Sequence, residues 1–194
     1  MGQRLNIEIV NGETSLANCY YHWSAYTGSA LNLTKHIIDS YYDSEAIVGL
    51  KMAIELLEAT GGGVNETERA EIQKQPEKFG GFEFKDCTNR NNGWISVTES
   101  GKEETRKWEE GRVTIDLGSE TFKFDVAWFD MPEEYFEEYC DEEDLQLEDL
   151  AVCKYDLDAV PFADIEDLID FIDSHPSGVR TNDDGEDMVI HWIC

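Results

Sequence analysis

Residues 113–128 constrain the fold of this chain more than any other stretch. Apolar side chains occupy every second position on both sides of the dipeptide Gly118-Ser119. The alternating residues are Val113, Ile115 and Leu117 before the dipeptide, and Phe122, Phe124, Val126 and Trp128 after it. A period of two is typical of a half-buried β-strand, and a glycine-containing dipeptide between two such runs is typical of a tight turn. The stretch therefore predicts a β-hairpin with one face in the core.

The start of the chain predicts a second hairpin. Leu5, Ile7 and Ile9 alternate with polar residues, and Asn11-Gly12 supplies the pair that tolerates a left-handed turn. Residues 15–23 then form the return strand. Two further strands are expected over residues 94–98 and 188–193, where β-branched and aromatic residues gather.

Apolar residues at helical spacing predict several helices between these strands. They are expected over residues 30–42 with Ser29 as a cap, from Ser44 to the triplet Gly61-Gly62-Gly63, and over residues 65–75, 100–110 and 162–174. The last has an apolar stripe (Ile165, Leu168, Ile169, Ile172) opposite an acidic side (Asp164, Glu166, Asp167, Asp170, Asp173). The prediction is an α+β fold, with an antiparallel sheet built from hairpins and helices packed on it. At 194 residues with 41% hydrophobic residues, the chain fits a single folded domain over residues 1–194.

Charge is distributed unevenly along the chain. The formal net charge is −28, from 43 acidic and 15 basic residues. Up to Lys123 there are 20 acidic and 13 basic residues; after it there are 23 acidic residues, with only Lys154 and Arg180 as basic ones. Such an excess repels nucleic acid and anionic membranes, so we expect neither as a direct partner. It favours binding to a protein with a basic surface. The strongly acidic part of the chain begins at about residue 124.

The densest acidic run predicts a partner-binding surface. Tyr135, Phe136 and Tyr139 lie on one side of an expected helix. Its acidic residues are Glu133, Glu134, Glu137, Glu138, Asp141, Glu142, Glu143 and Asp144. Carboxylates four residues apart repeat about every 6 Å along a helix, so the surface resembles a row of phosphates. The competing interpretation is an ordinary solvated helix face.

An aromatic group marks the end of the second strand. Tyr20, Tyr21, His22, Trp23 and Tyr26 lie within seven positions. His22, Trp23 and Tyr26 are expected to line a small-molecule pocket or to anchor an interface. The alternative is that these rings pack on the helices that follow.

No catalytic motif is present, and we expect no catalytic residue, metal or cofactor. The four histidines lack zinc-ligand spacing, and residues 182–187 lack the ligand pattern of a calcium loop. The five cysteines are irregularly spaced, which favours free thiols in a reducing compartment. Cys19 and His22 lie an odd number of positions apart, so a strand directs them to opposite sides. With no apolar run long enough for a membrane span and Glu8 interrupting any signal peptide, the expected location is the cytoplasm.

The run YYHWSAYTGSALNLTKHIIDSYYDSEAIVGL, residues 20–50, resembles the amino-terminal part of small uncharacterised phage and prophage proteins. In those proteins a strand that ends in His-Trp-x-x-Tyr is followed by a helix and a Tyr-Asp break. The resemblance covers about a quarter of the chain and implies a phage or mobile-element origin. It supplies no activity and no site residues.

Three hypotheses follow. The leading one is a non-enzymatic acidic binding protein, encoded by a phage, that inhibits a host defence or nucleic-acid-handling protein by nucleic-acid mimicry in the host cytoplasm. A nuclease or CRISPR-type effector is the partner expected. The second is a small-molecule or nucleotide-binding protein, or a small enzyme, with its site near His22, Trp23 and Tyr26. The third is an oligomeric structural component that binds copies of itself.

Overall fold

A computed structural model describes most of the chain. The described residues are 4–43, 64–75, 93–107, 109–126, 128–132, 151–152, 155–175, 177–181 and 187–192. Their helices are α1 (Thr27–Asp43), α3 (Glu66–Gln73), α5 (Glu99–Arg106) and α7 (Ile165–Ser174), the last preceded by a 3₁₀ turn, Phe162–Asp164. No helix among these residues is long and apolar enough to cross a membrane. The helix expected from Ser44 lies outside the described residues.

The larger sheet has six strands and is mixed. Their spatial order is β3 (Gly93–Ser96), β2 (Thr14–Tyr21), β1 (Leu5–Asn11), β4 (Gly111–Asp116), β5 (Thr121–Val126) and β8 (Val160–Pro161). Both predicted hairpins are present, as β1–β2 and β4–β5. The two hairpins meet through β1 and β4, which run parallel, with Ile7 opposite Val113. The α+β prediction is confirmed, but the expectation of a purely antiparallel sheet is wrong. Parallel pairing needs a long crossover, which the chain between β2 and β4 provides.

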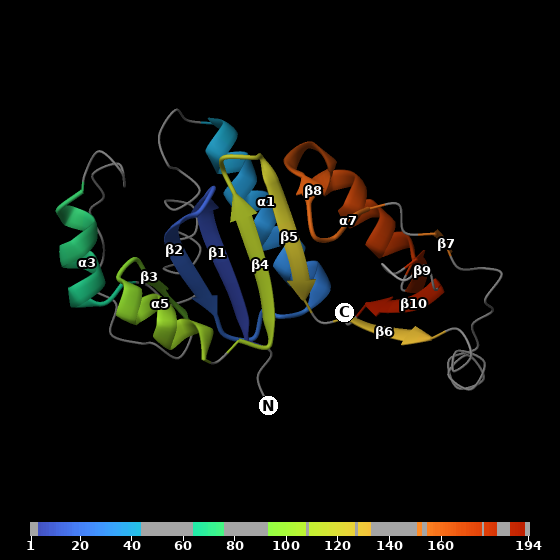
Figure 1. The fold of residues 1–194 in the computed structure, drawn as a ribbon, viewed down its shortest axis with the longest axis horizontal. Coiled ribbons are helices and arrows are strands. Elements are labelled where there is room, and N and C mark those ends of the chain that lie inside the picture. The colour runs from blue at the N-terminus through green and yellow to red at the C-terminus, as the bar shows by residue number, and fades with distance from the viewer. Residues whose placement is uncertain are drawn as a thin grey trace.

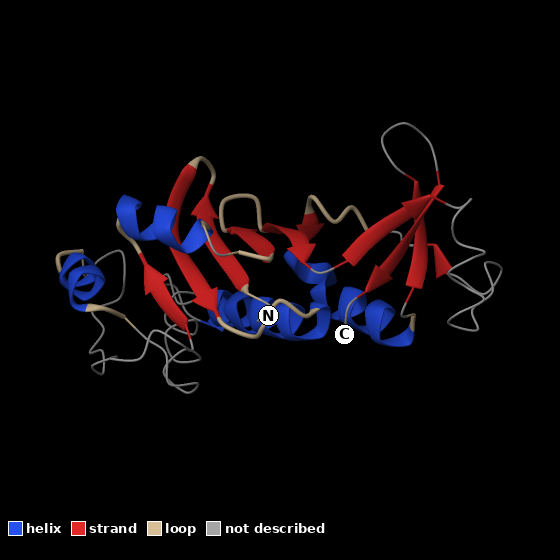
Figure 2. Cartoon of the chain, turned by 90° about the horizontal axis from the view of Figure 1, so that it is seen from below, coloured by secondary structure: helices blue, strands red, loops and turns tan. Residues whose placement is uncertain are grey.

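A second sheet of four strands lies beside the first (Figures 1 and 2). Its order is β6 (Trp128–Pro132), β10 (Asp187–Trp192), β9 (Ser177–Thr181) and β7 (Ala151–Val152). The strand expected over residues 188–193 is therefore present as β10. Trp128, expected to extend the β4–β5 hairpin, instead begins β6 and pairs with Trp192.

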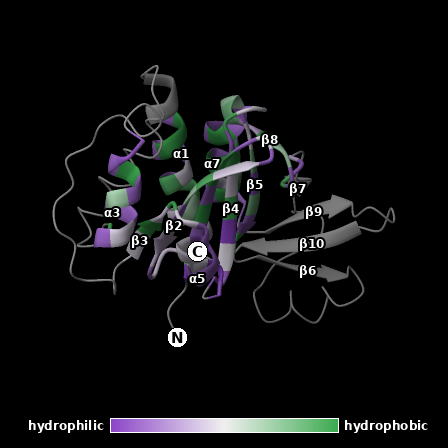
Figure 3. Ribbon diagram, turned by 60° about the vertical axis from the view of Figure 1, so that its left-hand side comes forward, coloured by the Kyte–Doolittle hydropathy of each residue, from purple (hydrophilic) through white to green (hydrophobic). Residues whose placement is uncertain are grey.

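The main core lies between the larger sheet and helices α1 and α7. Strand register places alternate residues of neighbouring strands on the same face, which is why they pack together. The buried strand residues are Leu5, Ile7, Ile9, Ala17, Cys19, Tyr21, Ile95, Val113, Ile115, Phe122, Phe124 and Val126. Ala30, Leu31, Ile37 and Ile38 of α1 and Ile165, Leu168 and Ile172 of α7 join them. In Figure 3 the green hydrophobic parts of α1 and α7 lie against this sheet. The apolar stripe predicted for residues 165–172 is thus core.

The turn between β4 and β5 differs from the expected two-residue turn. Four residues separate Asp116 from Thr121, and Glu120 is the residue with a left-handed φ of 54°. Gly118 lies close to the neighbouring β1–β2 turn. A Cβ there would come within 2.8 Å of Asn11 Oδ1 and 3.2 Å of the Gly12 nitrogen, so a side chain at this position would require Asn11 to move.

Asp116 joins these two turns. Its carboxylate accepts hydrogen bonds of 2.9 Å from the backbone N–H of Gly12, the backbone N–H of Gly118 and the hydroxyl of Ser119. Burial pushes the pKa of Asp116 upward, but these hydrogen bonds to the charged form outweigh it, so the pKa lies below its ordinary value.

We predict that Asp116→Ala lowers the free energy of unfolding by about 1–2 kcal/mol, because two backbone donors lose a charged acceptor. The depressed pKa means that this stabilisation is complete above the unfolded-state pKa of about 4 and is lost as pH falls below it. Urea denaturation of both proteins at pH 7 and pH 3 measures this difference. Glu13→Ala, an exposed change in the β1–β2 turn that Asp116 contacts, is the control. Equal losses for the two variants at pH 7 would contradict the role assigned to Asp116.

Candidate functional site

The side of the larger sheet opposite α1 and α7 is polar, and we call it the polar face. One row across it consists of Trp94, Tyr20, Asn6, Arg112 and Asp125, and the next of Ser96, Asn18, Glu8, Thr114 and Lys123. Each row follows from the register, because residues that pair across strands share a face. Helix α5 contacts β2 and β3 on this side, so it covers only part of the polar face.

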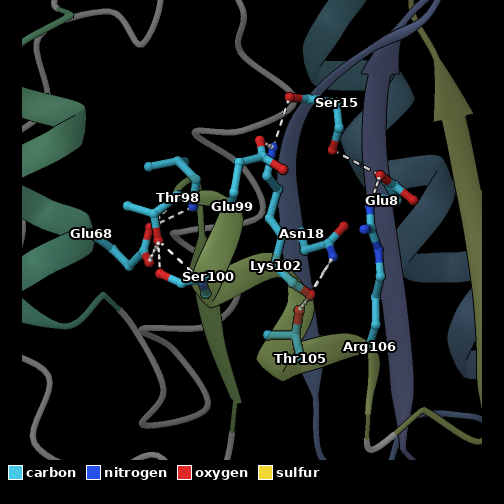
Figure 4. Close-up of polar contacts among 12 residues, drawn as sticks. Glu8, Ser15, Asn18, Glu68, Thr98, Glu99, Ser100, Lys102, Thr105 and Arg106 are labelled. Atoms are coloured by element: carbon cyan, nitrogen blue, oxygen red, sulfur yellow. Dashed lines mark hydrogen bonds and ion pairs between the residues drawn. The ribbon is translucent and has the colours of Figure 1, made fainter.

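A buried polar network lies beneath α5 (Figure 4). Lys102 is only 1% exposed, and its Nζ is 2.6 Å from Glu99 Oε1 and 3.1 Å from the carbonyl oxygen of Ser15. The amide of Asn18 donates to the Lys102 carbonyl at 3.3 Å and to Thr105 Oγ1 at 3.2 Å. The buried ammonium group therefore has partners, as a buried charge requires.

A second part of the network ties the strands to the end of α5. Glu8 of β1 accepts from Arg106 Nη2 at 2.5 Å and from Ser15 Oγ at 2.7 Å. This pair fixes the helix on the sheet through charge-assisted hydrogen bonds.

Glu68 connects α3 to the start of α5. The side chain is 2% exposed and accepts from the backbone N–H of Val97 at 2.5 Å, and from the N–H and hydroxyl of Thr98 at 2.9 and 2.5 Å. Thr98 is in turn the N-cap of α5, with its hydroxyl accepting from Gly101. The charged side chains of Lys102, Glu8 and Glu68 each have a partner, whereas Asn18 Oδ1 and Ser96 Oγ have none among the described residues. The network therefore serves to position α3 and α5 on the sheet.

The part of the polar face that α5 does not cover contains a hollow of about 400 Å³. It is lined by Glu109, Glu110, Gly111, Arg112, Thr114, Lys123 and Asp125. Arg112 Nε donates to Glu109 Oε2 at 3.1 Å, a second guanidinium nitrogen contacts the other oxygen of Glu109, and Lys123 pairs with Asp158. The carboxylate of Asp125 makes no hydrogen bond or salt bridge within the described part of the chain, but Asp125 lies opposite Arg112 and its charge raises the pKa of Lys123. The lining therefore carries a net charge of −1, with both cations already paired.

His22, Trp23 and Tyr26, which were predicted to line a pocket, do not all contact one another. His22 Nδ1 and the Tyr20 hydroxyl share a hydrogen bond of 2.9 Å, and the rings of His22 and Trp23 are 4.8 Å apart. The rings of Tyr20 and Trp94 are also in contact, with their centroids 4.5 Å apart and their planes tilted by 31°. We call Trp94, Tyr20, His22 and Trp23 the aromatic row. Tyr26 makes no ring contact with them among the described side chains, and its carbonyl instead accepts from Ala30 at the start of α1.

The exposed fraction of each aromatic side chain shows which of them belong to the core and which face solvent. Tyr20 and Tyr21 are buried, His22 and Tyr26 are half-buried, and Trp23 is 57% exposed. The expected strand over residues 15–23 ends at Tyr21, because Trp23 has a left-handed φ of 66°. That conformation disfavours a bulky side chain by about 1–2 kcal/mol. Backbone strain of this kind is concentrated at functional sites, which draws attention to Trp23.

The aromatic row and the hollow meet at one end of the polar face. The Glu110 N–H donates to the Arg4 carbonyl at 2.8 Å, and the Arg4 N–H donates to Glu110 Oε2 at 2.9 Å. Burial raises the pKa of Tyr20, while the charge of Arg4 and its hydrogen bond to the phenol oppose the rise and the charge of Glu110 adds to it. Arg4 therefore contacts both Tyr20 and Glu110, and Glu110 is part of the lining of the hollow.

Cys19 points into the core on the other side of β2 from His22, as their spacing predicts. The thiol is fully buried and free, and burial raises its pKa to about 12. A thiol in this state is a structural residue and a poor nucleophile.

The predicted acidic surface lies outside the described residues. It comprises Glu133, Glu134, Glu137, Glu138, Asp141, Glu142, Glu143 and Asp144. The acidic side of α7 is described: Glu166, Asp167, Asp170 and Asp173 are all exposed.

Sequence reasoning missed the hollow. Arg112, Thr114, Lys123 and Asp125 are visible in the sequence as the polar half of the β4–β5 alternation. Nothing in the sequence places Arg4 and Glu110 together, because that requires the parallel β1–β4 pairing.

Comparison with known proteins yields no match: no protein-family model, curated protein or solved structure is significantly similar to this chain.

Glu68→Ala is predicted to lower the free energy of unfolding by about 1–3 kcal/mol, because it leaves the part-buried N–H groups of Val97 and Thr98 without an acceptor. Glu66→Ala, an exposed change on the same helix, should stay within about 0.5 kcal/mol. Chemical denaturation compares the two. A small effect of Glu68→Ala would show that the carboxylate does not hold α3 to α5.

Two substitutions at Trp23 distinguish the effect of backbone strain on stability from the effect of the indole ring. Trp23→Ala removes the ring but keeps a Cβ at the left-handed φ, whereas Trp23→Gly removes both. We expect the glycine variant to be more stable than the alanine variant by about 1 kcal/mol, as measured by thermal unfolding. The opposite order would mean that the backbone at Trp23 is not left-handed.

Proposed function

We propose that this chain is a non-enzymatic binding protein that engages a basic surface on another protein. The observation that carries the proposal is the acidic side of α7. Its four acidic residues are exposed on the side opposite Ile165, Leu168 and Ile172, and the helix contains no basic residue. Within the described part of the chain only Glu166 has a salt-bridge partner, Lys35 at 3.1 Å.

This arrangement is unfavourable for the free protein. Asp170 and Asp173 lie in the second half of α7, where the helix dipole disfavours negative charge. Asp167, Asp170 and Asp173 are also three residues apart, so each neighbouring pair repels by a few tenths of a kcal/mol. A helix that only covered the sheet would be more stable with lysine at these positions. Contact with a cationic surface removes the repulsion, which supports a binding role.

The proposed partner is a protein that itself handles nucleic acid. The net charge of −28 disfavours direct contact with phosphates and accelerates association with a basic groove. A host nuclease or CRISPR-type effector has such a groove, and a phage origin, implied by the resemblance of residues 20–50, gives a reason to block it. In this proposal the carboxylates of α7 and of residues 133–144 take the place of phosphates.

A second candidate function is favoured by the exposed and strained Trp23. Its indole, against which His22 packs edge-on, offers a face on which a planar small molecule could stack. In that case nucleotides should raise the melting temperature of the protein, and His22→Ala should abolish the rise.

The proposal is tested by purifying partners of the tagged protein from host lysate, identifying them by mass spectrometry, and measuring the affinity of the purified complex. We expect Asp167→Asn, Asp170→Asn and Asp173→Asn together to slow association and to flatten the dependence of affinity on salt. Neutralising the acidic residues between 133 and 144 should act in the same direction.

The matched control changes the same number of charges elsewhere, as Glu13→Gln, Glu103→Gln and Glu104→Gln, all exposed. The proposal fails if no partner is recovered. It also fails if the complex keeps its affinity and its salt dependence when the acidic residues of α7 and of residues 133–144 are neutralised.

A further inference from the structure

We propose that the Asn11-Gly12 dipeptide is a site of spontaneous deamidation, and that Asp116 slows the reaction by binding the Gly12 nitrogen. The inference goes beyond the proposed function and does not depend on it. It concerns the β1–β2 and β4–β5 turns, which meet at one end of the larger sheet.

The two reacting residues lie at the β1–β2 turn. Asn11 is the last residue of β1 and pairs with Thr14, so Gly12 and Glu13 alone form the turn. Gly12 has a left-handed φ of 57°, and both Asn11 and Gly12 are exposed. Glycine carries no Cβ beside its nitrogen, so the side chain of the preceding residue approaches that nitrogen with little hindrance. Solvent therefore reaches a dipeptide whose local structure permits ring closure.

The reaction needs only this dipeptide and water. The Gly12 nitrogen loses its proton to solvent and attacks Asn11 Cγ, which forms a new C–N bond and closes a succinimide ring. The bond from Cγ to Nδ2 breaks, and the amide nitrogen takes up a proton and leaves as ammonia. Water then opens the ring. Addition of water at Cγ gives aspartate in the original backbone, whereas addition at the Asn11 backbone carbonyl carbon gives isoaspartate.

Asp116 acts on the nitrogen that has to attack. The parallel register places Val10 opposite Asp116, so the ends of β1 and β4 lie side by side (Figure 1). Asp116 Oδ1 accepts a hydrogen bond of 2.9 Å from the Gly12 N–H. The reactive form of Gly12 has lost this hydrogen and carries a negative charge. A carboxylate at hydrogen-bond distance disfavours a second negative charge beside it, so the contact raises the barrier to ring closure.

The products weaken the contact between the two turns. Asn11 Oδ1 and Asp116 Oδ1 both lie close to Gly118, at 2.8 and 3.2 Å from the position that a Cβ of this residue would take. Conversion of the Asn11 amide to a carboxylate brings two like charges together there, and they repel. Isoaspartate also adds a methylene group to the backbone at the last paired position of β1. The modified chain is therefore expected to be less stable.

The test follows deamidation of the full-length protein at neutral pH by peptide mapping. Mass spectrometry detects the gain in mass, and chromatography separates aspartate from isoaspartate. A synthetic peptide with the sequence of residues 6–16 gives the rate without the fold. We expect Asn11 to react several-fold more slowly in the protein than in the peptide. Asp116→Ala and Asp116→Asn should each raise the rate in the protein several-fold.

Glu68→Ala is the control for a general loss of stability, because it removes the carboxylate that joins α3 to α5 and leaves the turn residues unchanged. It should not alter the rate at Asn11. The other Asn-Gly dipeptide of the chain, Asn92-Gly93, is followed in the same digests. Its rate should be the same in the wild-type protein and in Asp116→Ala.

Several results would overturn the inference. Asn11 reacting as fast in the protein as in the peptide would show that the fold gives no protection. Equal acceleration by Glu68→Ala, or equal acceleration at Asn92, would show that Asp116→Ala acts through general unfolding. Slower deamidation in the Asp116 variants would make Asp116 a base that removes the proton from Gly12.

Asn11→Asp reproduces one of the products and tests its effect on the turns. It should lower the melting temperature by a few degrees. The loss should be smaller when Asp116→Asn is also present, because the repulsion requires both charges. An equal loss in the two backgrounds, or no loss in either, would contradict the proposed repulsion between the turns.

Discussion

The parallel pairing of β1 with β4 is the contact on which the larger sheet depends. Each strand begins a hairpin, so their pairing joins two local units into one sheet. It also sets the register that places Ile7 beside Val113 on the core side and Asn6 beside Arg112 on the other. A shift of one residue would exchange the two faces of a strand. The register of β1 and β4 therefore determines both which residues form the core and which form the polar face.

The two faces of this sheet are closed by different physical means. On one side α1 and α7 bury apolar residues, and the hydrophobic effect provides the driving force. On the other side α5 buries Lys102, Thr105 and part of Glu8 in a hydrogen-bonded network, and Glu68 brings α3 to the same place. The charged members of this network all have partners, although Asn18 Oδ1 has none in the described structure; removing one of those partners would leave a charge buried alone, which is strongly unfavourable. It fixes α5 at one end of the polar face and leaves the hollow open at the other.

Charge has three distinct roles in this chain. Within the α5 network it is buried and neutralised by neighbours. Around the hollow, cations and carboxylates alternate and nearly balance. On α7 the carboxylates are exposed and mostly uncompensated, at positions that weaken the helix itself. The last arrangement is the one from which we propose a basic partner, because uncompensated carboxylates attract a cationic surface over a long range.

The sequence alone determined the local elements. Alternation and turn residues predicted both hairpins, and helical spacing predicted the segments that form α1, α3, α5 and α7, because these signals depend on residues close together in the chain. The acidic side of α7 and the opposite directions of Cys19 and His22 followed for the same reason. Only the tertiary structure decided that β1 and β4 run parallel, since no local signal encodes which strands become neighbours. That pairing places Arg4 beside Glu110 and thereby joins the aromatic row to the hollow. The left-handed backbone of Trp23 was not predictable either. The aromatic residues of this segment indicate a strand that continues to Trp23, whereas in the fold the strand ends at Tyr21 and the Trp23 ring is exposed.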